Sequence, residues 1–309
     1  MATVKDFDAL ADQVRNWSRW GTADQRGTLN LITPEVVRKA AATITDGTTF
    51  PLGMDLSPRG PQLPGEVTGR MNPIRTMLAV NVPLAPPPDT SAYSDDLVIT
   101  PTQTATHWDA LSHTSFRASL YNGIPAGVIT AAGATELGID RFGVVLSRGV
   151  LLDVARHVGG AHLPRKFAIT REVLEATERA QGVAVEPGDV VLVRTGLGRF
   201  FLDGDIPGYR TEVPALDVDA ALYFHERDVA AVAIDNMPTE LLPSAVEGVA
   251  LPLHTLCLVM MGLPLGENWV LEDLAQACAA DGRYAFLLDA TPEPFVNSTG
   301  GLVSPVAIR

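Results

Sequence analysis

The sequence has few cysteines and few basic residues, and each shortage excludes particular structural features or binding partners. Only two cysteines, Cys257 and Cys278, occur among 309 residues, and both lie in apolar or helix-like runs. We therefore expect buried free thiols rather than a disulfide, which suits a reducing compartment. Lysine and arginine number 23 against 36 acidic residues, giving a net charge of −13. Nucleic acids and anionic membrane surfaces repel such a protein, so we expect neither as a partner.

Long apolar segments and two familiar active-site motifs are also missing. No uninterrupted apolar run reaches the roughly 20 residues of a membrane span, and early charges interrupt the apolar core that a signal peptide needs. We therefore expect a cytoplasmic protein. Residues 195–198 begin like a nucleotide-binding loop, but Phe201 stands where GxGxxG requires its third glycine. The absence of GxSxG argues against a serine hydrolase of that type.

The chain does have the composition and patterning of an α/β protein. Hydrophobic residues make up 46% and charged residues 19%, as in ordinary globular proteins. Thr33 and Thr170 are expected helix N-caps, with helices reaching about residues 46 and 181. Further helices are expected over about 217–226 and 271–280, and strands over 74–82, 97–102, 190–194 and 229–234, with two short ones within 143–154.

These strands are not spaced as regular βαβ units, which predicts a mixed central sheet flanked by helices. We find no internal repeat and no long linker, so residues 1–309 are predicted to form a single domain. Within it, residues 1–32 are an N-terminal arm that we expect to pack on the core or on a partner subunit.

The strongest chemical pattern is a short polar segment. Residues 102–113 read TQTATHWDALSH and hold two of the six histidines, His107 and His113, with Asp109 between them. The β-forming residues before them predict an extended strand through about Asp109. Because side chains alternate along a strand, every second residue from Gln103 to Asp109 is expected on one face.

That face would carry an amide oxygen, an imidazole and a carboxylate, which together are ligands for a divalent metal ion. His113 lies just beyond it, close enough to act on a molecule bound at the metal. A structural histidine–aspartate hydrogen bond is the alternative interpretation of the same spacing.

A second group lies near the other end of the chain. His254 opens an apolar run that continues to Met261, and Glu267 follows after the next turn. A histidine and a carboxylate at these places can complete a metal site. The alternative is a histidine that bonds to the backbone at a helix start, with a surface glutamate.

The two groups, in this order, resemble the metal-dependent hydrolases of the cyclase or kynurenine formamidase-like family. The motif of that family is H-x-G-T-H-x-D-x-x-x-H, and residues 103–113 read QTATHWDALSH. The resemblance extends over nearly the whole chain, through 20–31, YNG at 121–123, GDVVLVRTG at 188–196, LPLH at 251–254 and GGLVSP at 300–305.

The resemblance implies a swivelling β/β/α-type fold, a homodimer or homotetramer, and a Zn or Mn ion. His107 and Asp109 fall on metal-ligand positions of the family, and His113 falls on the catalytic histidine. His254 and Glu267 fall on the downstream histidine and acidic positions. Gln103 stands where the family has its first histidine ligand; it can coordinate through its amide oxygen, but more weakly than imidazole. Ala105 replaces the motif glycine.

The resulting hypothesis is metal-assisted hydrolysis of a small amide, lactam or lactone. The ion would activate water, and His113 would transfer the proton to the leaving group. We expect Trp17, Trp20 and Tyr121 to form an aromatic wall of the substrate pocket, and the loop over 55–73 to set specificity. Two alternatives remain: a metal-dependent cyclase or dehydratase acting on a polyketide-like substrate, and a non-catalytic small-molecule-binding member.

Overall fold

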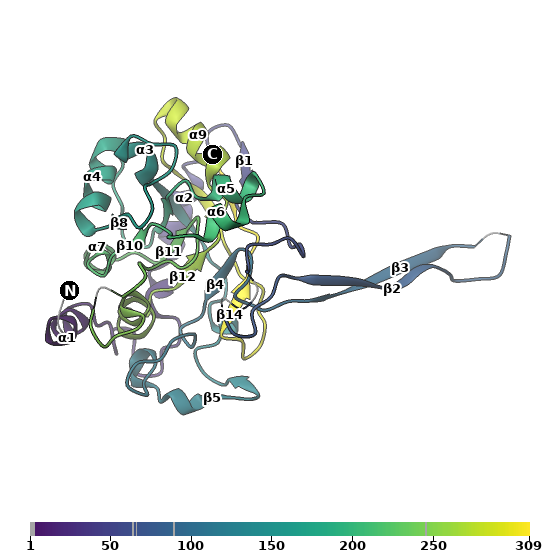
Figure 1. The fold of residues 1–309 in the computed structure, drawn as a ribbon, viewed down its shortest axis with the longest axis horizontal. Helices are drawn as coiled ribbons and strands as arrows, with labels where there is room; N and C mark the ends of the chain where they lie inside the picture. The colour runs from purple at the N-terminus through teal and green to yellow at the C-terminus, as the bar shows by residue number, and fades with distance from the viewer. Residues whose placement is uncertain (1–3, 64, 66, 89, 245) are drawn as a thin grey trace.

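The structure is a computed structural model that describes residues 4–63, 65, 67–88, 90–244 and 246–309. Within these residues a curled, mixed sheet of nine strands forms the centre, in the order β1-β15-β13-β7-β9-β11-β12-β4-β14 (Figure 1). The strands of this sheet are β1 (Thr49–Pro51), β4 (His107–Asp109), β7 (Leu146–Asp153), β9 (Val190–Arg194), β11 (Ala231–Ile234), β12 (Leu265–Glu267), β13 (Ala285–Asp289), β14 (Gly300–Leu302) and β15 (Val306–Ile308).

The middle of the sheet is parallel and its two sides are antiparallel. The parallel part consists of β7, β9, β11 and β12. On one side of it the sheet continues through antiparallel pairing of β13, β15 and β1, and on the other side through antiparallel pairing of β4 and β14. β9 and β11 are buried along their whole lengths. Their continuous apolar sequences therefore match strands covered on both faces. The predicted mixed central sheet is confirmed.

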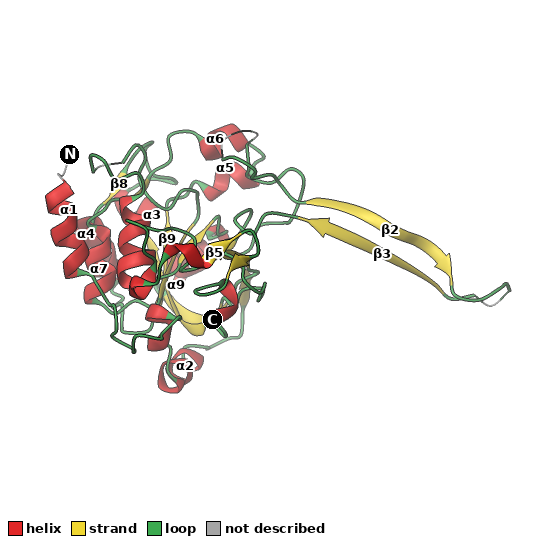
Figure 2. Ribbon diagram, turned by 90° about the horizontal axis from the view of Figure 1, so that it is seen from below, coloured by secondary structure: helices red, strands yellow, loops and turns green. Residues whose placement is uncertain are grey.

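Helices and short helical turns flank the sheet (Figure 2). The α-helices are α1 (Val4–Gln13), α2 (Pro34–Ala41), α3 (Val154–Val158), α4 (Arg171–Gln181), α5 (Gly198–Leu202), α6 (Ile206–Arg210), α7 (Ala220–Glu226), α8 (Pro252–His254) and α9 (Glu272–Asp281). The short helical turns are η1 (Gly27–Leu31), η2 (Tyr121–Gly123), η3 (Ala126–Val128), η4 (Ile139–Arg141) and η5 (Thr255–Met261). None of these helices, within the described residues, has the length and apolar character needed to cross a membrane.

Two helix starts form as the sequence predicts. The hydroxyl of Thr33 accepts a hydrogen bond from the backbone N–H of Val36, and Thr170 accepts one from Val173. Each threonine thereby satisfies a backbone donor that the first turn leaves free. The first of these helices ends at Ala41 rather than near residue 46, so that boundary prediction is wrong.

The N-terminal arm packs against the apolar run that follows His254. That run forms η5, a buried π-helical segment. Phe7 and Ala11 of α1 are buried in the same core, and the indole N–H of Trp17 donates to the carbonyl of Val259 at 2.7 Å. The arm therefore covers the core of its own chain, while the single-domain assignment over 1–309 stays a prediction.

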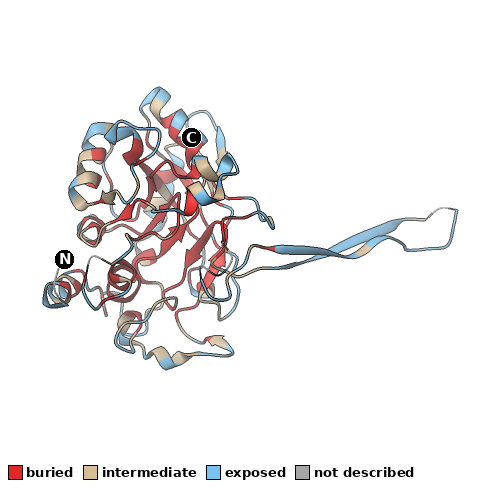
Figure 3. Cartoon of the chain, in the orientation of Figure 1, coloured by how far each residue is buried: buried red, intermediate tan, exposed pale blue. Residues whose placement is uncertain are grey.

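Among the residues that the structure describes, three strand pairs lie outside the central sheet. They are the long hairpin of β2 (Ile74–Pro83) and β3 (Ala92–Ile99), and the short pairs β5 (Ile129–Thr130) with β6 (Gly133–Ala134) and β8 (Ala168–Ile169) with β10 (Ala215–Leu216). The hairpin projects far from the body (Figures 1 and 2) and is coloured as exposed along almost its whole length in Figure 3. Its second strand ends at Ile99 rather than at residue 102.

Candidate metal centre

A buried group of side chains gathers where β4 lies between two other strands. β4 pairs antiparallel with β12, and the register places Glu267 directly opposite His107. Directly opposed residues share a face of the sheet, and so do residues two apart on one strand. His107, Asp109 and Glu267 therefore point into the same space, and all three are buried.

The distances within this group suit ligands of one ion better than hydrogen bonds. The Nε2 atom of His107 lies 3.7 Å from Oδ1 of Asp109 and 3.7 Å from Oε2 of Glu267. Hydrogen bonds between nitrogen and oxygen are normally 2.7–3.2 Å long. Two atoms that bind one zinc ion at about 2.1 Å lie roughly 3.4 Å apart in tetrahedral geometry.

The hydrogen bonding of His107 identifies the atom that is free to bind a cation. Its Nδ1 lies 2.9 Å from the carbonyl oxygen of Ala105. A carbonyl only accepts, so Nδ1 carries a proton, and Nε2 is the ring atom that faces the two carboxylates. Both Nε2 of His107 and Oδ1 of Asp109 are buried without a hydrogen-bond partner. Such unpaired buried atoms are costly unless a further group satisfies them, and a divalent cation fits both.

His254 joins the group from α8. Its Nε2 lies 3.8 Å from both Oδ2 of Asp109 and Oε1 of Glu267. Its other ring nitrogen donates to Glu240, whose carboxylate also accepts the backbone N–H groups of Leu253 and His254. Although burial opposes the charged ring, Glu240 and the other carboxylates raise the pKa of His254 to about 9.

His113 lies at the more open side of the group. Its side chain is 21% exposed, whereas the others are at most 6% exposed, and its Nε2 is 3.6 Å from Oδ1 of Asp109. Burial, and then the positive charges of His254 and Arg70, lower the pKa of His113 to about 4. The ring is therefore neutral at neutral pH and able to accept a proton.

The two carboxyl groups respond differently to the same environment. Burial raises the pKa of Asp109 to about 6, although His107 opposes the rise. The pKa of Glu267 is lowered despite its burial, because His107, His254 and two hydrogen bonds from Thr239 favour the charged form. Glu267 therefore brings a negative charge into the interior, and a bound cation would favour ionised Asp109 as well.

Gln103 lies beside His113. Its Nε2 is 3.4 Å from Nδ1 of His113 and donates to the Thr299 hydroxyl at 3.1 Å, while its Oε1 accepts from Thr102. The amide therefore contacts the side of the His113 ring that faces away from Asp109. Coordination of a metal by Gln103 stays a prediction.

The predicted strand over residues 103–106 is wrong. These residues form turns and bends, and β4 begins only at His107. Ala105 has φ of +46°, which breaks an extended strand. This left-handed conformation costs a non-glycine residue roughly 1–2 kcal/mol. Glycine, which the family motif has at this position, would adopt it without that cost. His107 and Asp109 still share one face, as expected.

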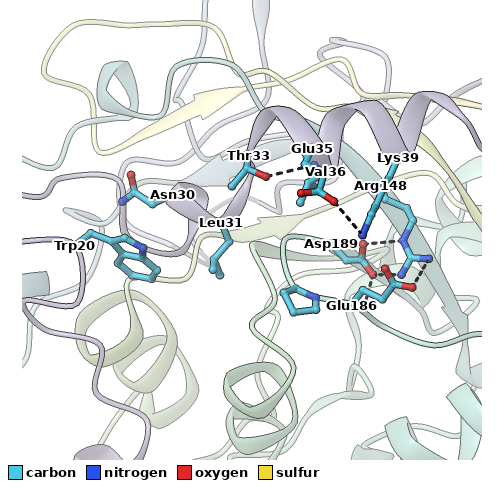
Figure 4. A pocket seen from close by; sticks show the side chains of 11 residues that line it. Trp20, Asn30, Leu31, Thr33, Glu35, Val36, Lys39, Arg148, Glu186 and Asp189 are labelled. Atoms are coloured by element: carbon cyan, nitrogen blue, oxygen red, sulfur yellow. Dashed lines mark hydrogen bonds and ion pairs between the residues drawn. The ribbon is translucent and has the colours of Figure 1, made fainter.

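The three aromatic residues that were predicted to line the substrate pocket contact other parts of the structure. Tyr121 is buried, and its hydroxyl donates to Asp24 at 3.1 Å. Trp17 bonds to the backbone of η5. Trp20 lines a cavity of about 480 Å³ whose other residues include Lys39 and Arg148 (Figure 4) and none of the histidine–carboxylate group. A substrate-binding role of these three aromatic residues stays a prediction.

A larger cavity lies next to the segment that leads into β4. It measures about 900 Å³ and is lined partly by the loop over 55–73 and by α5 and α6. Gln62 of this loop reaches the backbone oxygen of Gln103 at 3.5 Å, and the backbone of Met54 donates to Thr106 at 2.8 Å. The loop that was expected to set specificity thus contacts the segment just before His107.

Sequence reasoning missed the residues that hold the ligands in place. Glu240 and Thr239 lie 13 or more positions away from the groups that they bind, and no motif marks them. Asn268 follows Glu267 directly and donates to the Ala105 carbonyl that also bonds His107. Hydrogen bonds of this kind fix ligand orientation and commonly change metal affinity or activity 10–100-fold.

Replacing Glu240 with glutamine tests that positioning. The variant keeps the shape of the side chain but loses the charge beside Nδ1 of His254. We expect turnover and affinity for a divalent cation to fall by roughly 10–100-fold. Metal titration and steady-state kinetics measure the two effects, with Glu247→Gln on the same connecting segment as control. Wild-type values for both in Glu240→Gln would contradict a positioning role.

A curled mixed sheet that carries a buried histidine–carboxylate group of this kind defines an α/β protein with a candidate metal centre. Residues 26–240 match the family described as putative cyclase, so the chain belongs to that family. A search of curated proteins by sequence gives no match.

Solved structures agree with this assignment. The crystal structure of a novel cyclase is 37% identical, covers 97% of this chain and 99% of its own, and has a TM-score of 0.88. Isatin hydrolase A from Ralstonia solanacearum is 18% identical, with 89% and 97% covered and a TM-score of 0.65. A predicted metal-dependent hydrolase from Bacillus stearothermophilus is 17% identical, with 85% and 99% covered and a TM-score of 0.56. The last two share the fold.

Proposed function

We propose that this protein is a metal-dependent hydrolase of a small amide, lactam or lactone. The observation that carries the proposal is the pair of unpaired, buried atoms, Nε2 of His107 and Oδ1 of Asp109, 3.7 Å apart. The proton on Nδ1 of His107 leaves that pair free to bind a cation. The hydrolase relatives support the same class of reaction.

Four buried side chains offer ligand atoms for the ion. Among the described residues, His107, Asp109 and Glu267 form a group whose ligand atoms lie within 4.8 Å of one another, and His254 adds a nitrogen 3.8 Å from each carboxylate. Imidazole and carboxylate ligands together suit Zn or Mn. When bound, such an ion lowers the pKa of a water molecule and polarises a carbonyl group.

His113 would move the proton. Its neutral ring can take a proton from the attacking water at Nε2 and give it to the departing nitrogen or oxygen, so that the products are a carboxylic acid and an amine or alcohol. Gln103 would hold the His113 ring in place from its Nδ1 side. Because the hydroxyls of Thr102 and Thr299 can each donate or accept, the Gln103 amide can turn either its oxygen or its nitrogen toward Nδ1.

Elemental analysis of protein purified without added metal tests the proposal. We expect about one divalent cation per chain, turnover of some members of a panel of small lactones, lactams and aryl amides, loss of turnover on chelation, and recovery with Mn or Zn. The metal-free protein should also unfold at a lower temperature, because a ligand that binds only the folded state stabilises it. Full activity after complete removal of the ion would contradict a metal-dependent reaction, and a metal-free, inactive protein would favour a binding role.

A cyclase or dehydratase is the second candidate, because the relative with 37% identity is described as a novel cyclase. Hydrolysis differs from cyclisation or dehydration in that an oxygen atom from water enters the product. Hydrolysis in ¹⁸O-labelled water puts the label into the product carboxylate, whereas a cyclisation or dehydration leaves the product unlabelled.

A further inference from the structure

Arg70 brings a positive charge to the edge of the histidine–carboxylate group. It lies near the end of the loop over 55–73 and is partly buried. Its Nη1 atom is 3.4 Å from the sulfur of Met237. The side-chain nitrogen of Asn268 lies 3.9 Å from the same sulfur atom. The guanidinium is therefore held close to the end of β12, where the candidate ligand Glu267 lies.

Contacts on both sides of Arg70 keep the loop in this place. The backbone N–H of Gln62 donates to the side-chain oxygen of Asn72 at 2.9 Å, and the Asn72 amide donates back to the Gln62 carbonyl at 3.1 Å. The side-chain nitrogen of Gln62 also lies 3.7 Å from the sulfur of Met237. These contacts close the loop and place it against the same sulfur atom that Arg70 contacts.

The charge of Arg70 acts on two members of the histidine–carboxylate group. After burial and the charge of His254, it is the next cause that lowers the pKa of His113. Burial raises the pKa of Asp109, and Arg70 is among the charges that oppose this rise. Interactions between charges weaken with distance, so the guanidinium lies in the neighbourhood of both side chains.

Among the described residues, no carboxylate forms an ion pair with Arg70. Other partly or fully buried arginines are paired: Arg148 with Asp189 at 2.7 Å, and Arg194 with Glu272 at 2.8 Å. The sulfur atom that Arg70 contacts is only a weak hydrogen-bond acceptor. Most of the donors of this guanidinium are therefore available to another molecule.

We propose that Arg70 binds a carboxylate of the substrate, so that the protein acts on anionic amides, lactams or lactones. This inference rests on the proposed function, because it takes the histidine–carboxylate group as the place of the reaction. The planar guanidinium of arginine can bind both oxygens of a carboxylate. A divalent cation in the group would repel the unpaired charge of Arg70, and an anion bound between the two would remove that repulsion.

Paired substrates test the assignment. Each lactone or lactam that carries a carboxylate is compared with its parent compound, in which hydrogen replaces the carboxylate. We expect the wild type to favour the anionic member by at least about 10-fold in kcat/KM. Arg70→Met should raise KM for the anionic member by on the order of 100-fold, and Arg70→Lys should restore part of the preference. Arg75→Met is the control, because Arg75 lies on the exposed hairpin and pairs with Asp96.

Equilibrium binding provides a readout that needs no turnover. Succinate and phthalate each carry a second carboxylate that their monoamides lack, while both members of each pair keep one carboxylate for the metal ion. Calorimetric titration of the metal-loaded wild type should show at least about 10-fold tighter binding of the dicarboxylate. We expect the same preference in Arg75→Met and equal binding of the two members in Arg70→Met.

Equal affinity of the wild type for dicarboxylates and monoamides, or a preference that survives in Arg70→Met, would overturn the assignment. So would a fall in kcat that is equal for anionic and neutral substrates, which would make Arg70 a residue that stabilises the transition-state oxyanion. Metal content and turnover report on the proposed function itself. A metal-containing, active wild type without the preference refutes only the role of Arg70, whereas a wild type that binds no divalent cation refutes both proposals.

Discussion

Asp109→Asn is expected to leave the protein folded but unable to hold a stoichiometric divalent cation, with kcat/KM lowered by more than about 100-fold. The carboxylate of Asp109 lies 3.6–3.8 Å from ring nitrogens of His107, His113 and His254. Asparagine keeps the shape and removes the charge. Metal analysis of the purified variant and its kinetics on whichever substrate the wild type turns over measure the two losses.

Asp235→Asn is a matched control for this substitution. Asp235 is also a buried aspartate, and burial raises its pKa to about 6 as well, but it accepts hydrogen bonds from Thr195 and Gly196 instead of facing histidines. We expect Asp235→Asn to lower the unfolding temperature and to retain the ion. Metal-free Asp109→Asn should be at least as stable as the metal-free wild type, because it removes a buried charge. Metal retention by Asp109→Asn would exclude Asp109 as a ligand.

His113→Ala is expected to separate proton transfer from metal binding. The variant should keep its ion, because the four buried ligand candidates are unchanged, while kcat falls by roughly 10²–10⁴-fold, as is typical when a general acid or base is removed. Metal content, kcat and KM are measured on one preparation. Added imidazole should restore part of the activity, since the space left by the ring is partly open to solvent.

The exposed His157 on α3 provides the control for that experiment. His157→Ala removes an imidazole that lies outside the histidine–carboxylate group, and we expect wild-type kinetics from it. Undiminished kcat in His113→Ala would contradict the proposed proton transfer. Loss of the ion together with activity would make His113 a ligand instead.

Local patterns predicted the elements that depend on neighbours in sequence. The N-caps Thr33 and Thr170, and the buried strand over 190–194, follow from hydrogen bonding and burial within a few residues. The shared face of His107 and Asp109 follows from strand alternation alone. These features could be predicted because their causes lie within a single element.

Features that depend on distant residues could not be predicted in the same way. Two short strands were expected within 143–154, yet the chain forms one strand, β7, because β13 pairs with it through the polar residues Ser147 and Arg148. The strand predicted over 74–82 matches β2, whereas the one predicted over 97–102 only overlaps the end of β3. Alternation also cannot tell whether a strand joins the central sheet. Glu240 beside His254 depends on a fold that brings residues 14 positions apart together.

Both strands that pair with β4 come from much later parts of the sequence, so the candidate metal centre can form only late in synthesis. β4 is paired on one side with residues 265–267 and on the other with residues 300–302. A chain growing on the ribosome therefore exposes His107 and Asp109 long before either flanking strand exists. Glu267, their partner in the group, is made 158 positions after Asp109. If the proposed metal ion binds there, it would be acquired late, by a chain whose synthesis is nearly complete. Any product truncated before residue 265 would lack Glu267 and both strands that pair with β4.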